Sequence, residues 1–329
     1  VYKRQLVGNL RVTEVSSVRW DSLNDVVFGG TQDNGSSQQS IEAHDTLDND
    51  SDQIVDELDE RISGWTSIHN GDGASQEIVI FDSDSDGVDD RSIRISMSNN
   101  FKYAYRQEFD ADGDKVGSLE QIKFKSTPST DDFSGLTNPL DNPVKEDDDG
   151  KNTGFTGFAP IPLAVNRFDS SRMVIGLFSI YESSDRLDTV TEVHTGQTNR
   201  TSTGSFPWTQ KVRALVYGGM KGTTQKPDVI VAGIGSSIWY REAAGSTFTQ
   251  RAITSGSGQI KDIVVDPDNW KTVYVVGQRS VHRTTDITAD NPDWTRISHN
   301  FSGIRSIEYV RGTDTDILSG TDDILLVGT

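Results

Sequence analysis

Residues 260–286 read "IKDIVVDPDNWKTVYVVGQRSVHRTTD" and decide what kind of fold the chain can form. Three short runs with strand character, "DIVV", "TVYVV" and "SVHRT", are separated by turns rich in Asp, Pro, Asn and Gly. Apolar and β-branched runs of this length, bounded by such turns, are typical of β-strands. The stretch "DWTRISHN" at 293–300 suggests a fourth strand. The segment therefore predicts one four-stranded antiparallel sheet.

The same order of strands recurs along the chain. Related copies occupy 161–185, 212–245 and 304–329, and two earlier stretches, 15–30 and 75–98, match the opening of the pattern. Short strands that repeat about every 40 to 50 residues are the signature of a β-propeller, in which each four-stranded sheet is one blade. We therefore expect an all-β propeller of about five blades plus a half. The ring should be incomplete, because the last copy stops where its first turn should begin.

A single propeller domain is expected over residues 6–329, with two insertions. The first insertion, 38–63, is strongly acidic and holds a short helix candidate. The second, 126–158, is rich in Gly, Pro, Asp and Ser, which is typical of a long loop. Residues 1–5, "VYKRQ", resemble a translated sequencing adapter, so we exclude them from the fold. On that interpretation the chain is a fragment of a longer metagenomic reading frame.

The composition argues against several classes of function. The 329 residues carry a formal net charge of −19 and no cysteine. No basic run in the sequence could neutralise phosphates, so we expect no nucleic-acid partner. Without cysteine there can be no disulfide, thiolate zinc site or cysteine nucleophile, a pattern that fits many exported bacterial proteins. No apolar run approaches the roughly 20 residues of a membrane span, so we expect no membrane insertion.

Two hairpins resemble a known repeat motif. The stretches "YESSDRLDTV" (181–190) and "RTTDITADNPDW" (283–294) are similar to the Asp-box hairpin, Ser/Thr-x-Asp-x-Gly-x-Thr-Trp, of bacterial neuraminidase-type (BNR) repeat propellers. Both matches are degenerate, since Leu187 replaces the Gly of the first and extra residues interrupt the second. The resemblance implies that Asp185 and Asp286 cap backbone N–H groups of their own hairpins. A sialidase would also need an arginine triad and a Tyr–Glu pair, for which the sequence shows no motif.

A second resemblance is more specific. The turn "GGTQDNG" (29–35), followed by "GWTSIHNGDG" (64–73), resembles sortilin-like and xyloglucanase-like propellers, in which a Gly-Gly-x-Gln-Asp-Asn-Gly turn precedes a Trp and then Gly-Asp-Gly. The resemblance implies an extracellular ligand-binding propeller. In the xyloglucanase-like family an Asp at this turn is a catalytic acid. Asp33 matches that position, and Asp72 is the nearest candidate for the base. That family builds its cleft between two propellers.

Strand order sorts the polar turns by face. With the blade strands labelled A to D outward from the channel, the B-to-C and D-to-A connections share one face, where propellers usually hold their ligand. We therefore predict a ligand site at the channel mouth. Its residues are Gln32, Asp33, Asn34, Asp72, Asn99, Asn100, Lys102, Trp208, Gln278 and Arg279. The alternative is that Asp33 and Asn34 only form a turn before Gly35, as Asp-Asn-Gly commonly does.

The tryptophans divide between core and site. Trp20, Trp65, Trp239 and Trp294 fall at strand positions where blades pack, so we expect them in the core. Trp208, in "TGSFPWTQ" between two blades, lies on the same face as the predicted ligand site. It is the aromatic candidate for stacking on a sugar or a peptide, and anchoring of its loop is the alternative.

One loop predicts a metal site. The stretch "DSDSDGVDD" (82–90) resembles the Asp-x-Asp-x-Asp-Gly calcium loops of EF-hand-like and thrombospondin-type repeats. Alternate carboxylates can converge on one hard cation, and the Gly permits the sharp turn between them. The predicted calcium ligands are Asp82, Asp84, Asp86 and Asp90. The twelfth position, where an EF-hand supplies a bidentate Glu, is Ile93, and the alternative is a solvated acidic hairpin loop.

These patterns together predict a bacterial β-propeller module, extracellular or on the cell surface, that binds a carbohydrate or protein ligand. A glycoside hydrolase of xyloglucanase-like type, with Asp33 as its acid, is one alternative, and a structural module of a large adhesin is another. Calcium is the one cofactor that the sequence suggests. The sequence leaves the ligand and the oligomeric state open.

Overall fold

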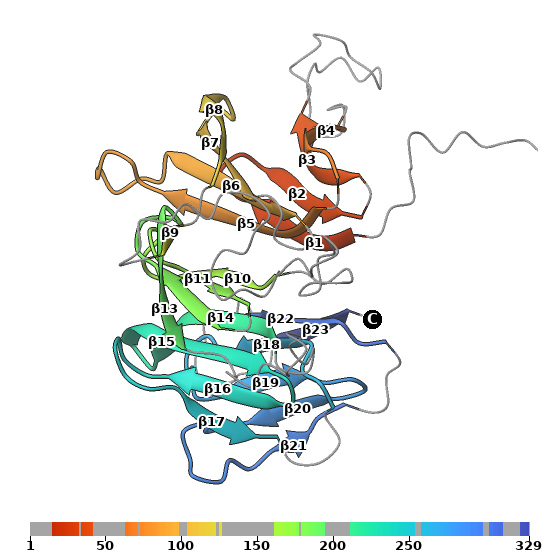
Figure 1. The fold of residues 1–329 in the computed structure, drawn as a ribbon, viewed down its shortest axis with the longest axis vertical. Coiled ribbons are helices and arrows are strands. Elements are labelled where there is room, and N and C mark those ends of the chain that lie inside the picture. Colours follow the sequence, from red (N-terminus) through yellow and green to blue (C-terminus); the bar gives the residue numbers. More distant parts are fainter. Residues whose placement is uncertain are drawn as a thin grey trace, which may run out of the picture. The chain divides into compact units, whose positions relative to one another are not determined.

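The computed structural model describes residues 15–32, 34–41, 63–71, 73–98, 104–122, 125–126, 161–177, 179–194, 211–253, 258–298, 303–311 and 323–328. Within these residues the regular structure consists of strands (Figure 1). No helix in the described part could cross a membrane. The chain divides into two compact units, Val1–Gln121 (unit 1) and Ile122–Thr329 (unit 2). A single domain over 6–329 stays a prediction.

Unit 1 contains two four-stranded sheets in which each strand pairs with the next one along the chain. All of these pairings are antiparallel. The first sheet consists of β1 (Val15–Asp21), β2 (Val26–Thr31), β3 (Gly35–Ile41) and β4 (Ser63–His69). The second consists of β5 (Gly73–Phe81), β6 (Arg91–Ser98), β7 (Ala104–Asp110) and β8 (Lys115–Gln121).

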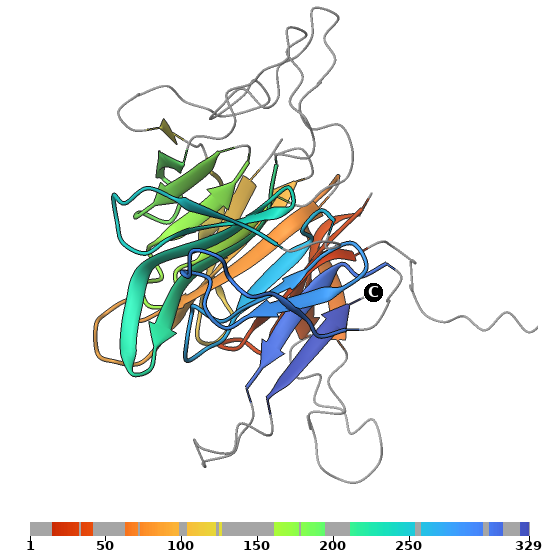
Figure 2. The same ribbon diagram turned by 90° about the horizontal axis from the view of Figure 1, so that it is seen from below.

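Unit 2 repeats the same order in two four-stranded sheets, one five-stranded sheet and a final two-stranded sheet. In Figure 2 the two strands of the last sheet lie side by side in dark blue. The strands are β9 (Lys125–Ser126), β10 (Leu163–Val165), β11 (Met173–Gly176), β12 (Ile180–Ser183), β13 (Thr189–His194), β14 (Val212–Lys221), β15 (Thr224–Ile234), β16 (Ser237–Arg241), β17 (Thr249–Ala252), β18 (Asp262–Val265), β19 (Val273–Val276), β20 (Val281–Thr284), β21 (Thr295–Arg296), β22 (Ser306–Val310) and β23 (Ile324–Gly328).

These sheets confirm the predicted all-β propeller class, with five blades and a half. One strand was not predicted: β9 adds to the outer edge of its sheet by pairing in parallel with β13. The predicted insertions are shorter at their starts than expected. Strand β3 takes in residues 38–41, and β9 takes in residue 126. The helix candidate of the first insertion lies outside the described residues.

The predicted capping role of the two Asp-box-like aspartates is confirmed. Asp185 Oδ1 accepts the Thr189 backbone N–H at 2.8 Å, and the Thr189 hydroxyl donates to Asp185 Oδ2 at 2.5 Å. Asp286 Oδ1 accepts the backbone N–H of Thr288 at 2.8 Å and its hydroxyl at 2.6 Å. These bonds hold the pKa of both carboxyls below the ordinary value, although burial opposes the shift at Asp185. The carboxylates therefore stabilise the turns at the outer strands.

Two blades of unit 2 pack through an apolar seam, which lies between the β14–β17 and β18–β21 sheets. Close packing is possible because Gly233 lacks a side chain, since a Cβ there would lie 2.6 Å from Ile260 Cγ2. Burial of an isoleucine side chain such as that of Ile260 stabilises the fold by about 1.5–3 kcal/mol. The apolar seam consists of Ala214, Val229, Val231, Ile238, Tyr240, Ile253, Ile260, Ile263, Trp270, Val273, Val275, Ile287 and Trp294.

The two blades of unit 1 pack differently, through a polar seam. From Ser92 to Ser98, strand β6 is buried on both faces, with Ser or Arg on one face and Ile or Met on the other. The polar face contacts the first sheet. Arg94 Nε donates to Asp21 Oδ2 at 2.9 Å, and Arg94 Nη1 donates to Gln38 Oε1 at 2.7 Å. The members of the polar seam are Asp21, Asn24, Ser36, Gln38, Ser92, Arg94 and Ser96.

Two of the four tryptophans expected in the core are not there. Trp294 is 7% exposed and Trp239 is partly buried, as expected. Trp20 and Trp65 are 52% and 61% exposed, so that prediction is wrong for them. The reason is that β1 turns its polar residues, including Arg19, towards β5, where Arg19 Nε donates to Glu77 Oε1 at 3.0 Å. The apolar residues of β1 consequently lie on the opposite face of the sheet.

Candidate functional site

The turn between β2 and β3 carries two of the predicted ligand-binding residues, Gln32 and Asn34. Both are partly buried. Asn34 Nδ2 donates to the Gln32 carbonyl at 3.3 Å, and the Thr31 hydroxyl donates to the Gly35 carbonyl at 2.9 Å. Asn34 therefore takes part in local turn bonding, as the alternative interpretation expected. Asp33, between them, lies outside the described residues.

This turn lies directly against the connection between β4 and β5. The Gly35 backbone N–H donates to the Gly71 carbonyl at 2.5 Å. Gly35 has a φ of +73°, and a Cβ on it would lie 1.7 Å from the His69 carbonyl oxygen. A Cβ on Gly73 would lie 2.2 Å from the Gly35 oxygen. The two sequence motifs are therefore in backbone contact, at a distance that only glycine permits.

A buried polar network lies beside these two connections. The Ser36 hydroxyl accepts a hydrogen bond from Gln76 Nε2 at 2.9 Å and lies 2.6 Å from the Ser96 hydroxyl. His69 Nε2 lies 2.5 Å from Ser96 Oγ. Ser36, Gln76 and Ser96 are 0%, 1% and 1% exposed. Within the described residues Gln76 Oε1 has no hydrogen-bond partner. We call Ser36, His69, Gln76 and Ser96 the rim network.

His69 links this network to the surface. Its Nδ1 lies 3.1 Å from the Asn70 carbonyl, and its ring centroid lies 5.3 Å from that of Tyr105. Burial lowers the pKa of His69, and the hydrogen bond with Asn70 opposes this shift only in part. A neutral ring with its proton on Nδ1 can donate to Asn70, and its Nε2 can accept the Ser96 hydroxyl when the Ser36 hydroxyl donates to Ser96. The rim network is therefore uncharged at neutral pH.

The arrangement suits recognition better than nucleophilic chemistry. Ser96 and His69 form a Ser–His pair, but Ser96 is 1% exposed, so a substrate could not reach its hydroxyl without rearrangement of the sheet. Hydroxyl, amide and neutral imidazole groups instead supply hydrogen bonds without net charge. Such groups match ligands that carry hydroxyls or amides.

Of the remaining predicted ligand residues, the two that the structure describes belong to unit 2. Gln278 and Arg279 are exposed in the turn between β19 and β20, the equivalent B-to-C turn of a blade in unit 2. A common rim for all ten residues stays a prediction. The other predicted residues, which lie outside the described residues, are Asp72, Asn99, Asn100, Lys102 and Trp208.

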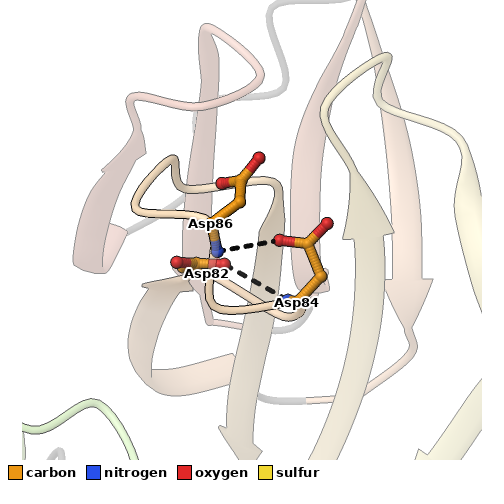
Figure 3. Close-up of side chains that lie close together, drawn as sticks. All are labelled: Asp82, Asp84 and Asp86. Carbon is orange, nitrogen blue, oxygen red and sulfur yellow. Dashed lines mark hydrogen bonds between the residues drawn. The ribbon is translucent and has the colours of Figure 1, made fainter.

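Three of the four predicted calcium ligands lie together in the loop between β5 and β6. One carboxylate oxygen from each of Asp82, Asp84 and Asp86 lies within 4.8 Å of the other two (Figure 3). Asp90 is not among them, because its carboxylate accepts the Ser83 backbone N–H and hydroxyl, both at 2.7 Å.

Backbone amides already use the carboxylate at the centre of this loop. Asp82 accepts the N–H groups of Ser85 and Gly87, both at 2.7 Å, and that of Asp84 at 3.2 Å. The bond from Gly87 contributes most to lowering the pKa of Asp82. Three converging carboxylates have the donor chemistry that calcium prefers, but the loop holds its shape through these amides as well. Calcium binding stays a prediction.

Sequence reasoning missed a charged cluster in unit 2. Glu182 on β12 accepts hydrogen bonds from the Tyr217 hydroxyl and from Arg241, whose Nη1 lies 2.9 Å from Oε2. Arg172 Nη2 donates to Glu182 Oε1 at 2.9 Å and to Asp228 Oδ1 at 2.8 Å. Burial raises the pKa of Glu182, but the hydrogen bonds from Arg241 and Tyr217 outweigh it and hold the pKa low.

This cluster contains a Tyr–Glu pair beside two arginines, yet its burial indicates a structural role. Tyr217 is 2% exposed, and the Arg241 side chain is 2% exposed. Both oxygens of Glu182 are bonded by guanidinium groups. The cluster therefore connects the β10–β13 and β14–β17 sheets of unit 2. No motif could have indicated it, because its members come from four separate strands and a loop.

Many solved structures are similar to this chain in fold. No protein-family model and no curated protein sequence matches the chain. Raptor from Chaetomium thermophilum is similar over 90% of this chain, with 10% identity and a TM-score of 0.50, and the match covers 22% of that chain. YCF48 from Cyanidioschyzon merolae gives 11% identity and a TM-score of 0.46, with 89% of this chain and 74% of that chain covered.

A third similar structure is described as an ancestral GH74 enzyme. It shows 13% identity and a TM-score of 0.39, and the match covers 68% of this chain and 24% of that one. The chain thus spans less than a quarter of the Raptor and GH74 chains. At these identities the likeness concerns the fold alone.

Proposed function

We propose that the chain is an extracellular or cell-surface β-propeller module that binds an uncharged polar ligand beside the β2–β3 turn. The observation that carries the proposal is the backbone contact between Gly35 and Gly71, which holds two polar connections together next to the rim network. A carbohydrate is the ligand that fits this chemistry, and a protein loop is the other outcome of the test.

The first support is the free-energy cost of an unsatisfied polar atom in the rim network. A buried polar atom without a partner costs about 1–3 kcal/mol, and Gln76 Oε1 is such an atom within the described residues. A buried water that bridges to a ligand hydroxyl would satisfy it. The second support is the aromatic wall, because the His69 and Tyr105 rings lie beside the same network and offer apolar faces to a sugar ring.

The test is an array of neutral oligosaccharides and a titration with the full chain. The variant Gln32→Ala with Asp33→Ala should lose binding, since it removes the polar groups of the turn but leaves Gly35 in place. Gln250→Ala is the control, because Gln250 is exposed on β17 in unit 2 and belongs to none of the predicted sites. Equal binding by the double variant and the unaltered chain would overturn the proposal. Binding of a protein by the unaltered chain, with no sugar bound, would reassign the ligand class.

A glycoside hydrolase is the second candidate, and one observation favours it. Gly35 and Gly71, which are in backbone contact, lie two residues and one residue from Asp33 and Asp72. An inverting hydrolase needs two carboxyls about 6.5–9.5 Å apart. This candidate predicts release of reducing ends from β-glucans, and loss of that release in Asp33→Asn with sugar binding retained. An adhesin module without a discrete ligand would show neither binding nor release.

A further inference from the structure

Cationic side chains gather at the starts of three inner strands of unit 2. Lys211 directly precedes β14, Lys261 directly precedes β18 and Arg305 directly precedes β22. Each therefore occupies the same position of its blade, and Arg213 is the second residue of β14. We call these four residues the basic cluster. They stand out in a chain whose formal net charge is −19.

The fold brings these positions together. Strand β14 contacts β18, and β18 contacts β22, and the three strands lie near one another in Figure 1. The starts of two of them are joined directly, because the Ile307 backbone N–H donates to Asp262 Oδ2 at 2.9 Å. Since these three strands each begin a blade, their first residues lie at the same end of the sheets.

A β-bulge sets Arg213 apart from its neighbours in the strand. Val212 pairs with Ile234, and Ala214 pairs with Gly233, which is the next residue of β15. Arg213 therefore has no partner residue on β15 and is the additional residue of the bulge. Bulges re-aim side chains and are common next to functional sites. Arg213 is the member of the cluster whose charge acts on both lysines.

The charges of the cluster oppose one another. Lys211 is 1% exposed, and its burial, followed by the charge of Arg213, lowers its pKa to about 7. Burial, followed by the charges of Arg213 and Arg305, also lowers the pKa of Lys261. Like charges near one another repel, and an anion placed among them relieves that repulsion.

We propose that the basic cluster is a binding site for an oxyanion group, carried by a small acidic ligand. Arginine binds carboxylate, sulfate or phosphate with two parallel hydrogen bonds, and lysine contributes a compact positive charge. Arg305 and Lys261 are exposed and can receive the ligand. This site is distinct from the proposed ligand site of unit 1, because all four residues belong to unit 2.

The test is calorimetric titration of the full chain with inorganic phosphate, sulfate and glucuronate as probes. We expect saturable binding that weakens as salt concentration rises. Arg305→Gln and Lys261→Gln should each weaken binding roughly tenfold, as loss of a hydrogen bond to a charged group does. Both residues are exposed, so these variants should fold, whereas loss of the buried Lys211 could disturb the sheet.

The matched control is Lys221→Met, which removes a lysine from the opposite end of the same strand β14. It should bind the probes as the unaltered chain does. Binding of phosphate and sulfate without glucuronate would specify a phosphate or sulfate ester, and binding of all three would specify a general oxyanion site. Absence of saturable binding, or an equal loss in Lys221→Met and Arg305→Gln, would overturn the proposal.

Discussion

The polar seam of unit 1 and the apolar seam of unit 2 solve the same packing problem with opposite chemistry. Both join two neighbouring blades of their unit, and both contain residues that are almost completely buried. The apolar seam consists of aliphatic and aromatic side chains. The polar seam is built around Arg94 and Asp21, whose side chains are 2% and 0% exposed.

The difference shows where stability and specificity come from. An apolar seam gains free energy in proportion to the area removed from water, and this gain does not depend on direction. A buried ion pair gains little net free energy, because desolvation opposes the attraction between its charges. Its hydrogen bonds are directional, however, so the polar seam fixes how β6 lies against the first sheet. The rim network continues this seam through Ser36 and Ser96.

The largest expected effect is in the polar seam. Arg94→Met leaves the Asp21 carboxylate buried without its ion-pair partner, and Arg94 also lies 3.8 Å from the Phe109 ring centre. Loss of one partner of a buried pair costs about 3–5 kcal/mol. Urea unfolding of the full chain should show this loss, and hydrogen exchange should place it in β6.

The control for this variant is Arg94→Met combined with Asp21→Leu. Removing both charges should restore part of the lost stability, because no unpaired charge then remains in the seam. If Arg94→Met alone destabilised the chain no more than an average surface substitution, the seam would not depend on the ion pair.

In the apolar seam we expect a substitution to lower the free energy of unfolding by a similar or smaller amount, and this loss should not depend on salt. Ile238 is 0% exposed, and Ile238→Ala should cost about 2–5 kcal/mol because it leaves a cavity. Ile297→Ala removes the same atoms at a site that is 44% exposed, so it should change stability little. Salt should not alter the Ile238 result. A salt-dependent loss would contradict the apolar description of this seam.

The blades could be predicted from sequence because apolar alternation and turn residues repeat together. The polar seam could not, because alternation says which residues share a face but not whether that face meets water. Ser92, Arg94 and Ser96 have the pattern of a solvated face, yet all three are buried against the first sheet. Trp20 and Trp65 show the opposite case. They have the pattern of a buried face, yet within the described residues this face of the β1–β4 sheet is left uncovered.

The candidate sites likewise divide into features that the repeating pattern indicates and features that it does not. The approach of 29–35 to 64–73 followed from strand order alone, and the contact of Gly35 with Gly71 agrees with it. The basic cluster was missed although its signal is in the sequence, because Lys211, Lys261 and Arg305 precede the first strand in three aligned repeats. Contacts among residues far apart in the chain, such as His69 with Ser96, leave no comparable signal.

A third prediction concerns the backbone contact beside the rim network. Gly35→Ala should destabilise the chain by at least about 1–2 kcal/mol, the cost of a left-handed residue with a Cβ. The clash with the His69 carbonyl should add to this. Gly71→Ala is the matched control, because Gly71 also has a positive φ but its Cβ would meet no atom within 4 Å. Thermal melts should therefore place Gly35→Ala below Gly71→Ala. Equal melting midpoints would mean that the β2–β3 turn and the β4–β5 connection are not in close backbone contact.

The smallest expected effect is that of calcium on the loop between β5 and β6. A ligand that binds only the folded state raises the melting midpoint, so calcium should raise it and a chelator should reverse the change. Asp84→Asn should reduce the response more than Asp90→Asn, because Asp84 belongs to the converging group and Asp90 is bonded to Ser83. The effect should stay small, since the Asp82 carboxylate already accepts three backbone N–H groups without a cation. A melting midpoint that a chelator leaves unchanged would mean that these amides alone hold the loop. The loop would then be an ordinary acidic turn between β5 and β6.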